Sequence, residues 1–141
     1  MMAGAAYLAD TTVFVLRGRH DDVKKRFDRL LIEGRLAFCQ MVLLECLNNA
    51  PDPKSYERLW TTLHGQRWVD ITAEAMDRAL DVHRALAKKS HHRSFKLPDL
   101  IIAAAELAGL TVLHYDEDYD WIAKITGQPV EWVAPKGSLW P

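Results

Sequence analysis

Short apolar segments that predict β-strands alternate along this chain with longer segments whose apolar residues recur at helical spacing. Val23, Phe27 and Leu30 illustrate that spacing, because they fall on one face of a helix. A chain in which strands and helices alternate predicts a parallel sheet covered by helices on both faces. We therefore expect a three-layer α/β/α fold around a central, mainly parallel, five-stranded sheet. The expected strands are residues 5–9, 35–39, 68–71, 111–115 and 130–133, with 68–71 the weakest of them.

The chain has the size of a single domain. Its 141 residues are enough to bury a core without disulfides or a structural metal. A content of 49% hydrophobic and 26% charged residues excludes a disordered or collagen-like chain. We expect residues 1–133 to form the domain. Residues 134–141 contain two prolines and a glycine, and we expect them to be a flexible C-terminal tail.

The cysteines and the apolar runs indicate where such a chain resides. Cys39 and Cys46 are seven residues apart, which is not the spacing of a metal knuckle. The first residues lack the basic stretch of a secretory signal, and the longest apolar runs, such as 100–105, are too short to span a membrane. We therefore expect a reduced, cytoplasmic protein with no membrane segment.

Four helical segments lead to more specific expectations. Thr72 is expected to cap a helix, and Pro98 to open one that ends at Gly109. The inner face of the helix after Thr72 is expected to contain Met76, Ala79, Leu80, His83, Leu86 and Ala87. The first two helices are expected to place their apolar residues in the core, with a groove for a partner as the alternative; these residues are Val13, Phe14, Leu16 and Phe27.

Several acidic residues lie where a solvated surface would not put them. Glu45 and Asp99 stand among apolar residues, Asp10 ends the first strand, and Asp116 and Asp118 follow the fourth. Parallel strands end at one edge of a sheet, so these side chains are expected to face one crevice. Crowded carboxylates repel one another, and a hard divalent cation removes that conflict. The set predicts a shared site for Mg²⁺ or Mn²⁺.

Each of these acids also has a local structural interpretation. Asp10 is a suitable cap for the helix after the first strand, and Asp116 and Asp118 suit turns or caps. Asp99 after Pro98 suits the start of a helix, and Glu45 lies on a segment that can have one exposed edge. A shared metal site accounts for all five acids together, which the separate interpretations do not.

Around these acids the chain resembles the PIN-domain ribonucleases, specifically the toxins of VapC-type toxin–antitoxin pairs. Order, spacing and chain length all agree, and the third and fourth matching segments together are the most specific. The matching segments are LADTTVF at 8–14, LLECL at 43–47, LPDLIIAA at 97–104 and GLTVLHYDEDY at 109–119.

The resemblance implies a PIN-like α/β fold and a metal-dependent endoribonuclease that cleaves tRNA or rRNA. It also implies a cognate antitoxin, which blocks the pocket, and a homodimer. Thr12 would occupy the family's hydroxyl position, orienting the first aspartate and the metal. The implied metal ligands, which with Thr12 would form the catalytic set, are Asp10, Glu45, Asp99, Asp116 and Asp118.

Two positions depart from the pattern of that family. His114 stands where many members have threonine or another small polar residue, and Tyr119 replaces the common phenylalanine. Neither change removes an implied ligand. A histidine at the end of a strand is more often structural than catalytic, so we expect a structural role for His114.

A basic segment precedes Asp99 although the whole chain has a net charge of −1. Residues 84–96 contain five cations, two histidines and no acid, which is typical of a surface that contacts RNA phosphates. The alternative is a solvated helix end, where cations suit the helix dipole. The candidate RNA-binding residues are Arg84, Lys88, Lys89, Arg93 and Lys96.

Two other functions remain compatible with the sequence. The first is a non-catalytic nucleic-acid-binding module with a PIN-like fold, which the basic segment favours. The second is a different metal-dependent nuclease or phosphoryl hydrolase, which would use the same acids. The presence of all five acids favours an enzyme over a module without catalysis.

Overall fold

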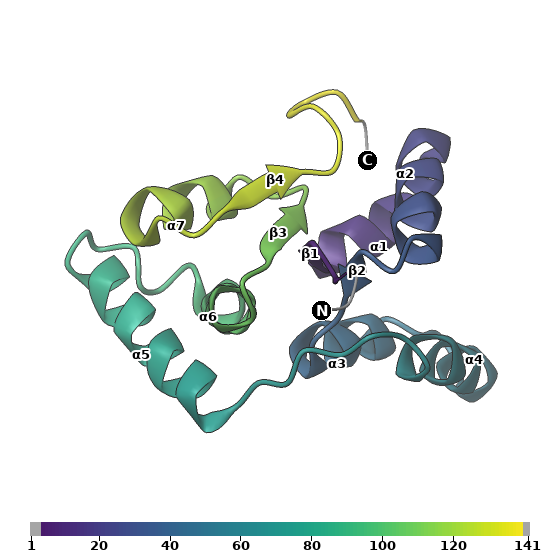
Figure 1. The fold of residues 1–141 in the computed structure, drawn as a ribbon, viewed down its shortest axis with the longest axis horizontal. Helices are drawn as coiled ribbons and strands as arrows, with labels where there is room; N and C mark the ends of the chain where they lie inside the picture. The colour runs from purple at the N-terminus through teal and green to yellow at the C-terminus, as the bar shows by residue number, and fades with distance from the viewer. Residues whose placement is uncertain (1–3, 140–141) are drawn as a thin grey trace.

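The computed structural model describes residues 4–139 and has a parallel sheet at its centre (Figure 1). The strands are β1 (Tyr7–Ala9), β2 (Leu36–Ala37), β3 (Thr111–His114) and β4 (Val130–Trp132), in the order β2-β1-β3-β4. All neighbours pair in parallel, and Leu8 lies opposite both Ala37 and Val112. The expected α/β fold is therefore confirmed.

The sheet has four strands within the described residues, so the expectation of five is wrong in this detail. The fifth segment, 68–71, is reduced to a single parallel bridge between Trp68 and Phe38. Beyond that bridge the chain turns away, and the backbone N–H of Ile71 donates to the Gln40 side chain. Thr72 already caps the next helix, so no length remains for a strand.

Helices cover both faces of the sheet, which makes three layers (Figure 1). Successive strand residues alternate between two apolar cores: Leu8 and Val112 pack in one, and Ala9 and Leu113 in the other. Val13 and Phe27 are buried in the second core, as the core interpretation of the first two helices predicts, whereas Phe14 and Leu16 pack against that core but are only half-buried. The helices are α1 (Thr11–Arg17), α2 (Asp21–Ile32), α3 (Gln40–Asn48), α4 (Pro53–His64), α5 (Ala73–Ala87), α6 (Lys96–Ala108) and α7 (Asp118–Thr126).

The inner face of α5 differs from the expected one. Ala79 and Leu86 are buried as expected, but Met76 and Leu80 are 48% and 68% exposed. The buried face is Ala75, Ala79, Val82 and Leu86, and α5 packs against α6. Helix α5 therefore has two apolar stripes. The buried stripe is the one that begins with the small residues Ala75 and Ala79, and the exposed stripe contains Met76 and Leu80.

Helix α6 begins two residues earlier than expected, at Lys96 instead of Pro98. Pro98 is still within the first turn, where its missing N–H removes no helical hydrogen bond. The helix ends where expected, because Gly109 adopts a left-handed conformation with φ of 70°. That turn leads directly into β3.

The described part of the C-terminal segment contacts the domain. The backbone N–H of Leu139 donates to the Tyr115 hydroxyl, and Leu139 packs against the second core. The last two residues of the expected tail lie outside the described residues. Across residues 4–139, no helix is both long enough and apolar enough to cross a membrane.

Candidate active site

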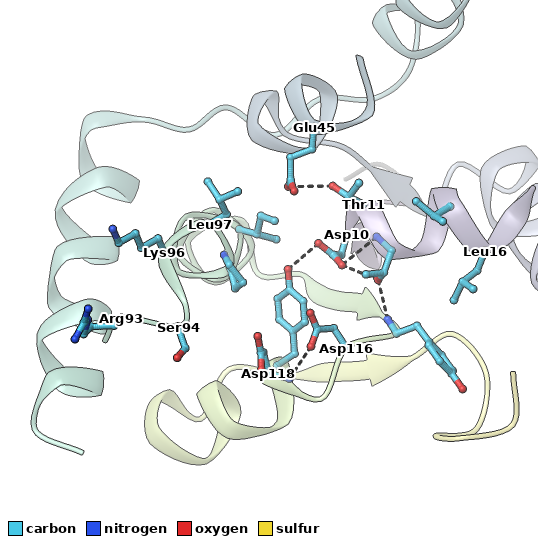
Figure 2. A pocket seen from close by; sticks show the side chains of 16 residues that line it. Asp10, Thr11, Leu16, Glu45, Arg93, Ser94, Lys96, Leu97, Asp116 and Asp118 are labelled. Atoms are coloured by element: carbon cyan, nitrogen blue, oxygen red, sulfur yellow. Dashed lines mark hydrogen bonds between the residues drawn. The ribbon is translucent and has the colours of Figure 1, made fainter. Parts of the chain in front are cut away.

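A cavity of about 560 Å³ opens at the carboxyl ends of the strands (Figure 2). Four of the five candidate acids line it, and they come from separate elements. Asp10 directly follows β1, Glu45 lies on α3, Asp116 follows β3, and Asp118 begins α7. The parallel sheet therefore brings these carboxylates to one edge.

Asp10 is held by hydrogen bonds to both of its carboxylate oxygens. Oδ2 accepts from the Thr12 backbone N–H at 3.2 Å and from the Thr12 hydroxyl at 2.6 Å. Oδ1 accepts from the Tyr119 hydroxyl at 2.8 Å. Asp10 is thus the N-cap of α1, as the local interpretation predicts, and it also lines the cavity. The two roles are compatible.

Glu45 reaches the cavity from α3 and contacts the start of α1 (Figure 2). Its Oε1 accepts a hydrogen bond of 3.0 Å from the Thr11 hydroxyl. Burial raises the pKa of Glu45, and the negative charge of Asp10 raises it further, while the Thr11 hydrogen bond opposes both effects. A cation in the cavity would relieve this conflict.

Asp116 and Asp118 form the opposite wall of the cavity. The backbone N–H of Asp118 donates to Asp116 Oδ1 at 2.9 Å, which fixes the turn that leads into α7. Burial raises the pKa of Asp118, and the charges of Asp116 and Glu117 add to that shift. The turn interpretation of Asp116 is therefore also correct, and it leaves the second oxygen of Asp116 available.

Asp99 does not line this cavity. Leu97 and Ile101 face it from α6, and a residue two positions after Leu97 lies roughly 200° around the helix. Asp99 is 2% exposed, and neither of its oxygens has a hydrogen-bond partner among the residues that the structure describes. Burial raises the pKa of Asp99 to about 7, and the electrostatic effect of His83 opposes this rise. The expected convergence thus holds for four acids, while the fifth is buried beside the site.

The side chains around the cavity offer the type of ligand atom, oxygen, that a hard divalent cation prefers. All four carboxylates offer oxygen, and none of them forms an ion pair with a basic side chain within residues 4–139. The four carboxylates do not yet surround a single point. In the described range, no three His, Cys, Asp or Glu side chains are close enough together to hold an ion. The two oxygens of Asp99, which are buried and have no hydrogen-bond partner among the described residues, are a further pair of candidate metal ligands.

Two of the five candidate RNA-binding cations lie at the cavity. Arg93 and Lys96 line it on the side away from Asp10 (Figure 2). Arg84, Lys88 and Lys89 do not line it, and all three are exposed. The basic segment is therefore divided into a part that borders the acids and a part that faces solvent elsewhere.

His114 lies beneath the site and holds the backbone of Asp116 in place. The ring is fully buried between Tyr119 and Trp132, and its Nδ1 accepts the backbone N–H of Asp116 at 3.0 Å. Burial lowers the pKa of His114, which keeps Nδ1 available as an acceptor. The expected structural role is consistent with this position.

Sequence reasoning missed two contributors to the cavity. The hydroxyl of Tyr119 contacts Asp10, whereas in the sequence Tyr119 stands out only as a replacement for the phenylalanine common in the family. The cavity also has an apolar wall, which sequence patterns alone assign to the core. The wall comprises Val15, Leu16, Leu97, Pro98 and Ile101.

The chain is similar to proteins of one family. The family model described as PIN domain matches residues 7–125. Ribonuclease VapC18 of Mycobacterium tuberculosis is 44% identical over 121 residues, which is 84% of this chain and 88% of that protein. Two solved structures share the fold with this chain.

A DNA-bound VapBC complex from Salmonella typhimurium has a TM-score of 0.72 at 18% identity, covering 92% of this chain and 99% of the other. A toxin–antitoxin complex from Klebsiella pneumoniae has a TM-score of 0.68 at 20% identity, covering 92% and 98%.

Proposed function

The chain belongs to the PIN-domain family, and from that premise we propose that it is a metal-dependent endoribonuclease toxin that cleaves RNA of the tRNA or rRNA class. One observation carries the proposal. Within residues 4–139, four carboxylates from separate elements line one cavity without forming ion pairs, and Arg93 and Lys96, which also form none there, lie on the same cavity. That combination suits a site for a divalent cation beside a site for a phosphodiester.

The acids would share the task of holding Mg²⁺ or Mn²⁺. Asp10, Asp116 and Asp118 would bind the ion, with Glu45 binding it directly or through water. When bound, such an ion supplies a more acidic water for attack and offsets negative charge on the phosphate. Thr12 would orient Asp10 through its hydrogen bonds. Asp99 would supply a further carboxylate to the ion from its buried position beside the cavity, where its oxygens have no hydrogen-bond partner within residues 4–139.

The other walls of the cavity would bind the RNA itself. Arg93 and Lys96 provide positive charge for backbone phosphates, while Leu97 and Pro98 provide apolar surface next to the acids. This surface suits the ribose and base of an unpaired nucleotide, because a paired base is not free to contact it. Arg84, Lys88 and Lys89 would extend the phosphate contacts along the same segment.

We further propose that the protein acts in a toxin–antitoxin pair. A cognate antitoxin would block the cavity, and a homodimer would form the toxin unit. The solved structures of the same fold that are toxin–antitoxin complexes support the antitoxin. In this proposal residues 1–133 form the PIN domain, and the protein acts in the cytoplasm.

The proposal is tested with purified protein and a panel of single-stranded RNA, double-stranded RNA and DNA. We expect cleavage of RNA with Mg²⁺ or Mn²⁺, none with EDTA, and none by Asp116→Asn. Asp77→Asn is the matched control, because it makes the same change on an exposed position of α5. It should cleave like the wild type.

The same panel separates the rival functions. RNA binding without turnover, unaffected by Asp116→Asn, would support the non-catalytic module. Preferential cleavage of DNA would support another nuclease. Full activity in EDTA would contradict every function that uses the acids to hold a metal.

A further inference from the structure

Tyr119 is a buried tyrosine whose hydroxyl contacts the candidate site. It lies in the first turn of α7, is 1% exposed, and donates from its hydroxyl to Asp10 Oδ1 at 2.8 Å. We infer that Tyr119 is a positioning residue, which holds Asp10 in the orientation in which it binds the divalent cation. The inference rests on the proposed function and adds a residue to it.

The hydroxyl completes a set of donors that fixes Asp10 from two sides. Thr12 donates to Oδ2 from the start of α1, whereas Tyr119 donates to Oδ1 from α7. The Thr12 hydroxyl also accepts the backbone N–H of Tyr115 at 2.9 Å. The carboxylate is therefore tied to α1 and to residues 115–119, which are two of the chain segments that line the cavity, and it cannot rotate without breaking a hydrogen bond.

These donors leave Asp10 able to bind an ion. An ionised carboxylate has about four lone-pair sites, and three donors reach Asp10. Partners that orient a ligand in this way typically change metal affinity by about 10–100-fold when they are removed. The hydroxyl reduces the loss of side-chain freedom that Asp10 would otherwise undergo when the ion binds.

The ring of Tyr119 is positioned by packing that does not depend on the hydroxyl. It lies against His114, with ring centroids 4.8 Å apart, and belongs to the larger apolar core. A phenylalanine would keep this packing and lose the contact with Asp10. The role of the hydroxyl can therefore be separated from the role of the ring.

The test measures Mn²⁺ binding to the RNA-free protein by electron paramagnetic resonance, together with the Mn²⁺ dependence of cleavage. For Tyr119→Phe we expect the Kd for Mn²⁺ to rise about tenfold. The Mn²⁺ concentration for half-maximal cleavage should rise by the same factor. The rate at saturating Mn²⁺ should stay within about twofold of the wild type, because no reacting group is removed.

Two further variants isolate the hydroxyl. Tyr7→Phe is the matched control, since the Tyr7 hydroxyl donates to Glu131 at 3.1 Å outside the cavity, and its Kd should not change. Tyr119→Leu should show the Mn²⁺ shift of Tyr119→Phe and also a lower free energy of unfolding, because it removes the ring.

The outcomes separate this inference from the proposed function. An unchanged Kd for Mn²⁺ in Tyr119→Phe overturns the inference, and so does a shift that appears only in Tyr119→Leu. A wild-type protein that binds no Mn²⁺ and cleaves no RNA overturns the proposed function, and the inference with it.

Discussion

Asp99 is a buried acid whose protonation affects the stability of the folded protein. Both of its oxygens are buried without hydrogen-bond partners, and burial raises its pKa to about 7. An aspartate in an unfolded chain titrates near ~3.9. Between these two pH values the folded protein retains a proton that the unfolded chain releases. The free energy of unfolding therefore falls as the pH rises from about 4 to about 7.

We predict that Asp99→Asn removes this dependence. In the presence of EDTA, the free energy of unfolding of the variant minus that of the wild type should increase by about 2 kcal/mol between pH 5 and pH 8. Urea denaturation at a series of pH values measures the difference. Asp77→Asn, which is exposed on α5, should give a flat profile. A flat profile for Asp99→Asn as well would mean that its carboxyl is not buried in solution.

Thr12 allows a second prediction at the level of a single hydroxyl. Thr12→Val removes the 2.6 Å hydrogen bond to Asp10 and leaves the backbone N–H of Tyr115, a half-buried residue, without its acceptor. Unfolding should cost about 1–3 kcal/mol less, and cleavage should fall about 10–100-fold. Thr12→Ser keeps the hydroxyl and should restore most of both quantities, as measured by denaturation and by RNA cleavage. A serine variant as impaired as the valine variant would contradict a role for the hydroxyl.

The residues of the site were predictable to different degrees. Asp10 and Asp116 were predictable in position, because each follows a strand of a parallel sheet and all such strands end at one edge. Asp99 was not predictable in orientation, because the rotation of α6 about its axis depends on tertiary packing. The Tyr119 contact joins residues 109 positions apart, and no local pattern indicates a contact of that range.

At the scale of elements, the turn between α6 and β3 determines where the strand enters the sheet. Gly109 has a φ of 70°, and a Cβ added there would meet no atom within 4 Å. Gly109→Ala should therefore lower the free energy of unfolding by about 1 kcal/mol through backbone strain alone. Gly18→Ala is the control, because Gly18 has a φ of −75° and its nearest contact is 3.6 Å away. Denaturation should show little change for Gly18→Ala, and equal losses in both variants would contradict this reasoning.

Elements were predicted well where the periodicity was long and poorly where it was short. The helices that begin at Pro53 and after Thr72 lie where capping residues indicate. Residues 68–71 pair at only one position, because the chain must turn to begin α5. The burial of α5 was misassigned, since two apolar stripes on one helix give no sequence signal that selects between them.

Residues 88–96, which join α5 to α6 and include the first residue of α6, allow a prediction about RNA binding. Arg93 and Lys96 border the cavity, whereas Lys88 and Lys89 do not. In an Asp116→Asn background, the double change of Arg93 and Lys96 to alanine should weaken RNA binding. It should also reduce the slope of log K against log salt by about 1.4, or ~0.7 for each phosphate contact. The same change at Lys88 and Lys89 should have a smaller effect. Fluorescence anisotropy over a range of NaCl concentrations distinguishes them, and equal effects would indicate a surface spread over the whole segment.

At the scale of the molecule, charge is nearly balanced but unevenly distributed. The chain has 18 basic and 19 acidic residues, so the net charge of −1 gives no general attraction to RNA. Attraction must come from the rim of the cavity, and it is opposed by the carboxylates inside. An ion held by those carboxylates changes the sign of the local field, so ion binding and RNA binding should be coupled.

Ion binding should therefore also stabilise the fold as a whole. A ligand that binds only the folded state at ~100 times its Kd adds about 2.7 kcal/mol to the free energy of unfolding. For a chain of this size that corresponds to a rise in Tm on the order of 10 °C. We predict that saturating Mg²⁺ produces such a rise in differential scanning calorimetry, whereas NaCl at the same ionic strength does not, because screening relieves repulsion between the acids only in part. Asp116→Asn should reduce the Mg²⁺ effect strongly, since it removes a donor from the cavity wall. An equal rise in NaCl and Mg²⁺ would mean that the carboxylates are relieved by screening and hold no specific ion.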